Sequence, residues 1–189
     1  MAKTATRNQL RIIAGQWRSR KLSFPSIEGL RPTPDRVRET LFNWLAPTIE
    51  GARCLDLFSG SGALGLEALS RGAGEVVMLD QNSKVIRQLK ENLSLLDCTQ
   101  GKVVQSDAIS YLQSCPDRFD IVFLDPPYRQ NLIAPCCALL AQNSLLNPGA
   151  AIYIELEKEA SLPELPTDWT LTRSKTAGQL AYHLVVVGG

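Results

Sequence analysis

Apolar and polar residues alternate near the start of the chain. Leu10, Ile12 and Trp17 are separated by polar residues around a turn at Gly15, so the spacing predicts a β-hairpin over residues 10–24. Trp17 is expected to pack in the hairpin core or to stack on a bound base.

The spacing of apolar positions then becomes helical. Val37, Leu41 and Trp44 lie at i, i+4 and i+7, which predicts an amphipathic helix that ends near residue 45. Thr33 is the expected N-cap of this helix, and Pro34 is suited to its first position.

From residue 52 onward, short apolar strands alternate with helical segments. Strands are expected at 54–58, 76–80, 102–105, 120–124 and 150–154, and helices at 62–70, 83–96, 109–112 and 131–142. Repeated strand–helix units predict a mostly parallel sheet with helices on both faces. A last hairpin, at about 169–175 and 180–187, predicts an antiparallel C-terminal edge. The expected fold is α/β and Rossmann-like, with a seven-stranded sheet and a small N-terminal β-hairpin.

The composition is that of a soluble globular protein, with 44% apolar and 21% charged residues in a chain of 189. No apolar run reaches the roughly 18 residues of a membrane span, and the start has no apolar signal core, so a cytoplasmic location is expected. Five Cys form no CxxC pair and only one His is present, so neither a metal site nor a disulfide is expected.

Charge is distributed unevenly although the net charge is only +1. Residues 1–27 contain six Lys or Arg and no Asp or Glu, which suggests either a nucleic-acid partner or a solvated surface. The candidate RNA contacts are Arg11, Arg18, Arg20, Lys21, Arg31 and Arg36. Arg31, Arg36 and Arg38 are also compatible with contact to a cofactor carboxylate or with a solvated helix surface.

A glycine-rich loop follows the strand expected at 54–58. Residues 60–65 read Gly-Ser-Gly-Ala-Leu-Gly, and Asp80 lies 20 residues after Gly60, at the end of the next strand. Glycines there allow a tight turn and close approach of a ligand, and the acid suits ribose hydroxyls. A nicotinamide dehydrogenase is therefore one hypothesis, and a tight turn without a ligand is another.

Asp56 favours a different cofactor. It lies four residues before Gly60 and faces the same cleft, where it would repel a pyrophosphate but attract the ammonium of S-adenosylmethionine. The run from Asp56 to Gly62 resembles the first motif of class I methyltransferases. In that fold Asp80 matches the ribose-binding acid and Asp107 the position that contacts the adenine amino group. Asp107 is equally compatible with a helix N-cap.

Asp125-Pro126-Pro127-Tyr128 follows the strand expected at 120–124. Two prolines fix the backbone and remove two N–H donors, which leaves carbonyl and carboxylate acceptors for an exocyclic amine. Tyr128 offers a face on which a base can stack. The tetrad resembles the signature of amino methyltransferases that act on adenine, cytosine, guanine or a glutamine side chain.

Residues 31–43, Arg-Pro-Thr-Pro-Asp-Arg-Val-Arg-Glu-Thr-Leu-Phe-Asn, are similar to the hallmark of the RsmD family, and the resemblance covers nearly the whole chain. That family methylates N2 of guanine 966 in 16S ribosomal RNA. The resemblance implies a class I methyltransferase fold over residues 31–189, a basic hairpin extension over 1–30 and S-adenosylmethionine as cofactor. It also implies 16S rRNA of the assembled or assembling small ribosomal subunit as partner, and we expect a monomer.

The residues expected to act fall into two groups. The catalytic set is Asp125, Pro126, Pro127 and Tyr128. The cofactor-binding set is Asp56, Phe58, Gly60, Ser61, Gly62, Asp80 and Asp107.

Three other functions are considered. A DNA adenine or cytosine methyltransferase shares the chemistry, but usually carries a target-recognition region for which 189 residues leave no room. A dehydrogenase needs a hydride-site partner, and the sequence has no Tyr-x-x-x-Lys and only one His, remote from the cleft motifs. A noncatalytic RNA-binding module would not need the Asp-Pro-Pro-Tyr tetrad.

Overall fold

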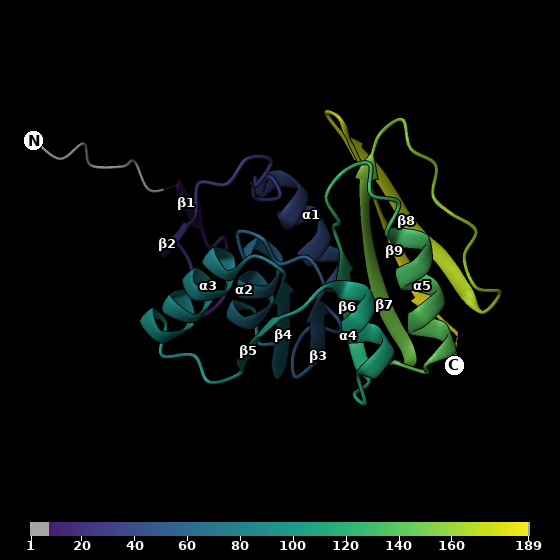
Figure 1. Ribbon diagram of the computed structural model, residues 1–189, viewed down its shortest axis with the longest axis horizontal. Helices are drawn as coiled ribbons and strands as arrows, with labels where there is room; N and C mark the ends of the chain where they lie inside the picture. Colours follow the sequence, from purple (N-terminus) through teal and green to yellow (C-terminus); the bar gives the residue numbers. More distant parts are fainter. Residues whose placement is uncertain (1–7, 189) are drawn as a thin grey trace, which may run out of the picture.

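The N-terminal hairpin is a separate two-stranded sheet. The computed structural model describes residues 8–188, so Lys3 and Arg7 of the basic segment lie outside the described residues. Strand β1 (Asn8–Arg11) pairs antiparallel with β2 (Lys21–Phe24), as the alternation predicts. Figure 1 shows the hairpin beside helix α3 (Ser83–Leu95) at one end of the long axis.

The main sheet has seven strands in the order β5-β4-β3-β6-β7-β9-β8. The strands are β3 (Arg53–Asp56), β4 (Glu75–Asp80), β5 (Gly101–Gln105), β6 (Phe119–Leu124), β7 (Leu146–Glu157), β8 (Trp169–Ala177) and β9 (Leu180–Val187). Strands β3 to β7 are parallel, and β9 pairs antiparallel with both β7 and β8. The predicted parallel sheet with an antiparallel C-terminal edge is confirmed.

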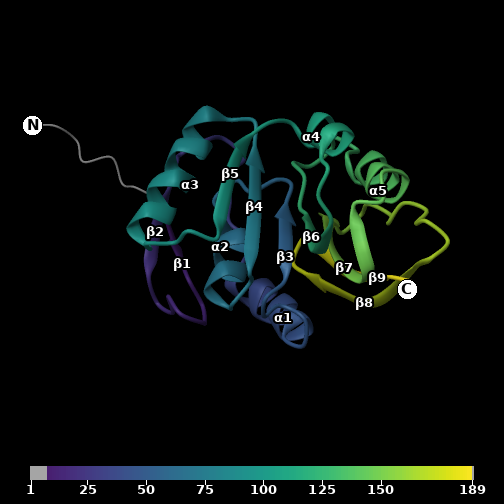
Figure 2. The same cartoon turned by 90° about the horizontal axis from the view of Figure 1, so that it is seen from below.

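Helices cover both faces of this sheet. One face carries α1 (Asp35–Leu45), α2 (Ala63–Ser70) and α3, and the other carries α4 (Ala108–Ser114) and α5 (Ile133–Gln142). Figure 2 shows α1 on the opposite side of the strands from α4 and α5. Among residues 8–188, no helix is long and apolar enough to cross a membrane.

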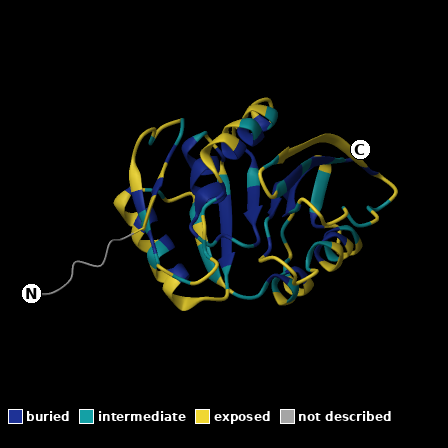
Figure 3. Ribbon diagram, turned by 90° about the horizontal axis from the view of Figure 1, so that it is seen from above, coloured by how far each residue is buried: buried dark blue, intermediate teal, exposed yellow. Residues whose placement is uncertain are grey.

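The middle strand β6 shows why the sheet needs cover on both faces. Ile121 and Phe123 pack into the core beneath α1, α2 and α3, whereas Val122 and Leu124 pack into the core beneath α4 and α5. All four are fully buried, as expected for a parallel strand covered on both sides. Figure 3 colours each residue by burial: the central strands are buried, whereas the outer surfaces of the helices and loops are exposed.

A buried ionic network attaches the hairpin to α2. Glu67 accepts hydrogen bonds from the backbone N–H groups of Ile13 and Ala14 at 2.9 and 3.1 Å. It also pairs with Arg38 at 3.4 Å and Arg71 at 2.7 Å. Residues of the hairpin and of the sheet share one apolar core, so hairpin and sheet are packed as one body.

Arg38 has a role that the sequence analysis did not predict. Its side chain is 1% exposed and donates to the Arg11 and Thr33 carbonyls at 3.1 Å each, besides pairing with Asp35 and Glu67. The prediction that Arg38 lies on a solvated surface or contacts a ligand is therefore wrong. Its guanidinium has five N–H donors, and the chain itself provides acceptors for four hydrogen bonds from it.

The start of α1 also differs from expectation. Pro34 occupies the N-cap position, and no side chain caps the helix. The prediction of Thr33 as N-cap is wrong, because the Thr33 hydroxyl points elsewhere and donates to Oδ2 of Asp125 at 3.4 Å. The segment before α1 is thereby connected to the loop that follows β6.

Candidate active site

A cavity of about 700 Å³ lies at the carboxyl ends of the parallel strands. Its walls come from residues 27–34 before α1, from the loop after β3, from the ends of β4 and β7, and from the loop after β6. In open parallel sheets ligands bind at this edge, and the volume suits a nucleoside-sized ligand. Five predicted cofactor residues line the cavity: Asp56, Phe58, Gly60, Ser61 and Asp80.

The glycine loop between β3 and α2 depends on two of its glycines for different reasons. Gly62 has a φ of 82°, a left-handed conformation that glycine adopts at little cost. A Cβ on Gly65 would lie 2.7 Å from the Met78 side chain and 3.0 Å from Oδ2 of Asp56. Gly65 therefore lets α2 pack closely against the sheet, while Gly62 turns the chain at its N-terminus.

Asp56 is a buried carboxylate at the end of β3. It is 2% exposed, and its Oδ2 accepts the backbone N–H of Gly65 at 3.1 Å. Burial raises the pKa of Asp56 to about 7, because desolvation disfavours the charged form. Within residues 8–188 no Lys or Arg pairs with it, so a cationic ligand group would stabilise its ionised form.

Asp80 and Asp107 follow the next two strands outward, as predicted. Asp80 accepts the backbone N–H of Gly60 at 3.1 Å on one oxygen and that of Asn82 at 2.8 Å on the other. Each carboxylate oxygen has a second acceptor position, so Asp80 can still accept from ribose hydroxyls.

The Asp107 carboxylate caps α4 by accepting the Ser110 N–H at 2.8 Å, and this bond lowers its pKa. Its neighbours Ser106 and Ala108 line the cavity, as do the neighbours of Gly62 in the glycine loop. Asp107 and Gly62 themselves are not among the residues that line it.

The predicted tetrad lies beside the glycine loop, because β6 is the neighbour of β3 in the sheet. Asp125, Pro126, Pro127 and Tyr128 all line the cavity. Asp125 lies beside Glu155, because the residues that precede them, Leu124 and Ile154, are partners in the register of β6 with β7. Burial, and then the charge of Glu155, raise the pKa of Asp125 well above its usual range. The Tyr128 side chain is 48% exposed, so one face is accessible to a planar ligand.

Glu155 is a residue of this site that the sequence analysis missed. It lies in β7, is 4% exposed and lines the cavity. The Tyr153 hydroxyl donates to its Oε2 at 2.6 Å, and burial raises its pKa. The available signal was its position: it follows the apolar run 150–154 directly, as Asp125 follows the run 120–124.

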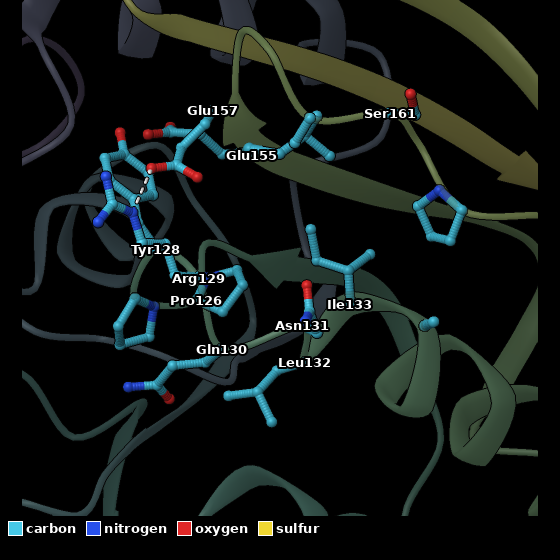
Figure 4. A pocket seen from close by; sticks show the side chains of 15 residues that line it. Pro126, Tyr128, Arg129, Gln130, Asn131, Leu132, Ile133, Glu155, Glu157 and Ser161 are labelled. Carbon is cyan, nitrogen blue, oxygen red and sulfur yellow. Dashed lines mark ion pairs between the residues drawn. The ribbon is translucent and has the colours of Figure 1, made fainter.

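A smaller pocket of about 170 Å³ adjoins the tetrad on its other side. Figure 4 shows residues 126–133 on one side of it and Glu155 and Glu157 of β7 on the other. Arg129 and Glu157 form an ion pair at 3.9 Å across its mouth. Pro126, Pro127, Tyr128 and Glu155 line both spaces, whereas Asp125 lines only the larger one.

The predicted RNA contacts are all exposed: Arg11, Arg18, Arg20, Lys21, Arg31 and Arg36. Only Arg31 lines the large cavity. Arg11 pairs with Asp35 at 3.0 Å, and Arg20 donates to the Leu95 carbonyl at 3.2 Å. In the described part of the chain, no cluster of three His, Cys, Asp or Glu side chains could hold a metal ion.

Comparison with known proteins places this site in a family. The family model described as "Conserved hypothetical protein 95" matches residues 10–186. The chain belongs to this family. The match includes the hairpin, the cavity and the tetrad, and it confirms the predicted membership of the RsmD family.

Relatives and solved structures agree. The chain is 52% identical over 176 residues to ribosomal RNA small subunit methyltransferase D of Escherichia coli, covering 93% of this chain and 89% of that protein. The Haemophilus influenzae protein of the same name is 48% identical over 182 residues, with 94% of each chain covered. A solved structure of yhhF from Escherichia coli superposes with a TM-score of 0.90 at 49% identity, covering 96% of this chain and 99% of that one.

Proposed function

We propose that this protein transfers a methyl group from S-adenosylmethionine to the exocyclic N2 of a guanine in 16S ribosomal RNA, namely guanine 966. The observation that carries the proposal is that the Asp125-Pro126-Pro127-Tyr128 tetrad and Asp56, Gly60 and Asp80 line one and the same cavity. The names of the close relatives support ribosomal RNA of the small subunit as the substrate class.

The donor groups of the cavity fit S-adenosylmethionine. Asp56 is a buried carboxylate without a cationic partner in residues 8–188, and it suits the ammonium of the amino-acid moiety. Asp80 retains acceptor positions for the ribose hydroxyls. Phe58 lines the same cavity, and Asp107, which caps α4 between the cavity residues Ser106 and Ala108, is assigned to the adenine amino group.

The tetrad is suited to hold an aromatic amine. When bound, S-adenosylmethionine supplies a methyl group on a positively charged sulfur, activated for transfer to the amine nitrogen. Asp125 and the Pro126 carbonyl accept hydrogen bonds from the amine and orient its lone pair. The negative charge of Asp125 stabilises the positive charge that develops on this nitrogen, which then loses one proton. Tyr128 stacks on the base.

The exposed arginines and Lys21 are the proposed contacts to RNA. Arg11, Arg18, Arg20 and Lys21 lie on the hairpin and its turn, and Arg31 and Arg36 lie at the cavity and at the start of α1. Phosphate contacts of this kind position the RNA but do not read its sequence. The assembled or assembling small subunit is the proposed form of the substrate, and the monomer the proposed active form.

Mass spectrometry of 16S rRNA from a strain that lacks this protein tests the proposal. We expect one N2-methylguanine to disappear at position 966, and to return when the wild-type gene but not the Asp125→Asn gene is supplied. Unchanged rRNA would contradict the substrate. Calorimetric titration separates the cofactors, because binding of NAD instead of S-adenosylmethionine would favour a dehydrogenase.

A further inference from the structure

Asp125 and Glu155 occupy equivalent positions on neighbouring strands. Leu124 of β6 and Ile154 of β7 are partners in the parallel register, so the next residue on each strand lies at the same level of the sheet. Leu124 and Ile154 pack beneath α4 and α5, and side chains alternate along a strand. Asp125 and Glu155 therefore point to the opposite side, into the cavity that both of them line.

The two carboxyl groups have hydroxyl donors but no cation. Thr33 donates to Asp125 at 3.4 Å, and Tyr153 donates to Glu155 at 2.6 Å. Among residues 8–188 neither carboxyl forms an ion pair. Burial raises the pKa of both. A buried and a half-buried acid placed side by side in a cleft, without a cation from the described residues, indicate a ligand that brings its own N–H donors.

Guanine is the base whose edge matches two neighbouring acceptors. Its N1 carries one hydrogen and the adjacent N2 carries two, so three donors lie side by side. Adenine and cytosine place their amine next to a ring nitrogen that is an acceptor, which a carboxylate repels. Proteins that recognise RNA bases specifically read this Watson–Crick edge.

We infer that Glu155 accepts the N1–H of the target guanine while Asp125 accepts from its N2 amine, so that Glu155 determines the specificity for guanine. This inference rests on the proposed function. The Tyr153 hydroxyl holds Glu155 at one oxygen and leaves the other available to the base. The smaller pocket, which Glu155, Pro126 and Tyr128 also line, gives the ring of the base a place beside these residues.

The test uses a base that keeps the amine but lacks the N1 hydrogen. Small-subunit particles are reconstituted from ligated 16S rRNA with either guanine or 2-aminopurine at the nucleotide that the wild-type protein methylates. The wild type is expected to prefer guanine by at least about 10²-fold in kcat/KM, since a site built to accept an N–H rejects a base without it. Equal rates on the two bases would overturn the inference without any variant.

The Glu155→Gln variant then assigns this preference to one residue. Its amide N–H₂ can donate to the N1 acceptor of 2-aminopurine, so the guanine preference should fall at least about tenfold. Loss of activity on both bases by the same factor would overturn the inference. Affinity for S-adenosylmethionine and the melting temperature report whether the variant is folded.

A matched control and one further outcome complete the experiment. Glu159→Gln removes an exposed carboxylate four residues further along the chain that lines neither pocket, and it should leave the guanine preference unchanged. A change in preference as large as that of Glu155→Gln would overturn the assignment to Glu155. A wild-type protein that methylates adenine or cytosine and not guanine would overturn the proposed function together with this inference.

Discussion

Two buried acidic centres in this molecule have opposite surroundings. Glu67 on α2 is fully buried and is paired with Arg38 and Arg71, besides two backbone N–H groups of the hairpin. Asp125 and Glu155 also lie against apolar strands, yet in residues 8–188 they receive hydroxyl hydrogen bonds and no cation. The chain compensates the first centre itself and leaves the second uncompensated.

The difference indicates that Glu67 stabilises the fold, whereas Asp125 and Glu155 serve ligand binding. Removing an ion from water costs several kcal/mol, and only good internal partners offset that cost. Around Glu67 the partners come from two segments distant in sequence, the hairpin and α1, besides Arg71 at the end of α2, so the ionic network fixes how the hairpin sits on the sheet. Around Asp125 and Glu155 the missing donors must come from a ligand, which is typical of a functional site.

The largest expected effect is on folding, at Glu67. Glu67→Gln leaves the buried Arg38 without its full countercharge, and breaking a buried pair of this kind typically costs about 3–5 kcal/mol of unfolding free energy. Urea denaturation measures the loss. Glu50→Gln, at an exposed position, is the control and should change stability by less than about 0.5 kcal/mol. A loss below about 1 kcal/mol for Glu67→Gln would show that the network is not structural.

The next effect is on catalysis, at Asp125. Asp125→Asn keeps the shape and one acceptor oxygen but removes the negative charge and directs an N–H₂ donor at the amine. Removing one preorganised electrostatic contact typically lowers the rate by about 10²–10³. Single-turnover methyl transfer to small-subunit particles, with a labelled methyl donor, measures it.

Affinity for S-adenosylmethionine should stay nearly intact in Asp125→Asn, because Asp80 ends β4 and Asp107 caps α4, away from the loop after β6. Near-normal turnover would exclude charge stabilisation by Asp125. Loss of cofactor binding would instead move Asp125 to a different subsite.

The sequence did not predict the ionic network around Glu67. Of the second centre it predicted Asp125 but not Glu155. Strand–helix alternation and the local motifs predicted the sheet, the glycine loop, Asp56, Asp80 and the tetrad, because each depends on neighbouring residues. Arg38 has the helical spacing of a surface charge, and only the packing of the hairpin against α2 buries it. Its role depends on contacts between distant segments, which periodicity does not contain.

Thr33 and Glu155 were missed for related reasons. Ser or Thr before a helix usually caps it, yet here the hydroxyl reaches Asp125, which is 92 residues away in sequence. Glu155 was missed because the strand was expected to end at residue 154, whereas β7 continues to Glu157. The register of β6 with β7 then places Glu155 beside Asp125.

Asp80 is intermediate between Glu67, which has cationic partners, and the uncompensated acids Asp125 and Glu155. Two backbone N–H groups donate to Asp80, and no cation pairs with it in the described residues. We expect Asp80→Ala to weaken S-adenosylmethionine binding by at most about 1.5–3 kcal/mol for each charge-assisted bond to ribose. Calorimetric titration measures the affinity, and an unchanged melting temperature shows that the fold persists. Unchanged affinity would remove Asp80 from the site.

The exposed positive charges of the basic hairpin give a further prediction, which concerns RNA binding. Replacing Arg18, Arg20 and Lys21 with Ala should weaken RNA binding and reduce the slope of log affinity against log salt by about 2. S-adenosylmethionine affinity should barely change. The matched control removes three exposed positive charges elsewhere: Lys158, Arg173 and Lys175. An equal change of slope in both variants would mean that the hairpin is only a solvated surface.

The smallest effect concerns Asp56, whose ionisation should couple cofactor binding to pH. Burial raises its pKa to about 7, so the carboxyl is mostly neutral at pH 6 and mostly ionised at pH 7.5. Only the ionised form attracts the ammonium of S-adenosylmethionine, so affinity should rise about eightfold over this interval. The sign follows from the raised pKa: an acid with its ordinary pKa would already be ionised at pH 6, and the affinity would be flat.

Two controls assign this pH dependence to Asp56. Asp56→Asn cannot ionise, so its affinity for S-adenosylmethionine should be lower at pH 7.5 and nearly independent of pH. Methylthioadenosine lacks the amino-acid moiety, so its affinity for the wild type should not rise between pH 6 and 7.5. A rise that persists in Asp56→Asn would assign the titration to another group. A rise with methylthioadenosine would show that the carboxylate does not face the ammonium, and that Asp56, like Glu67, belongs to the architecture.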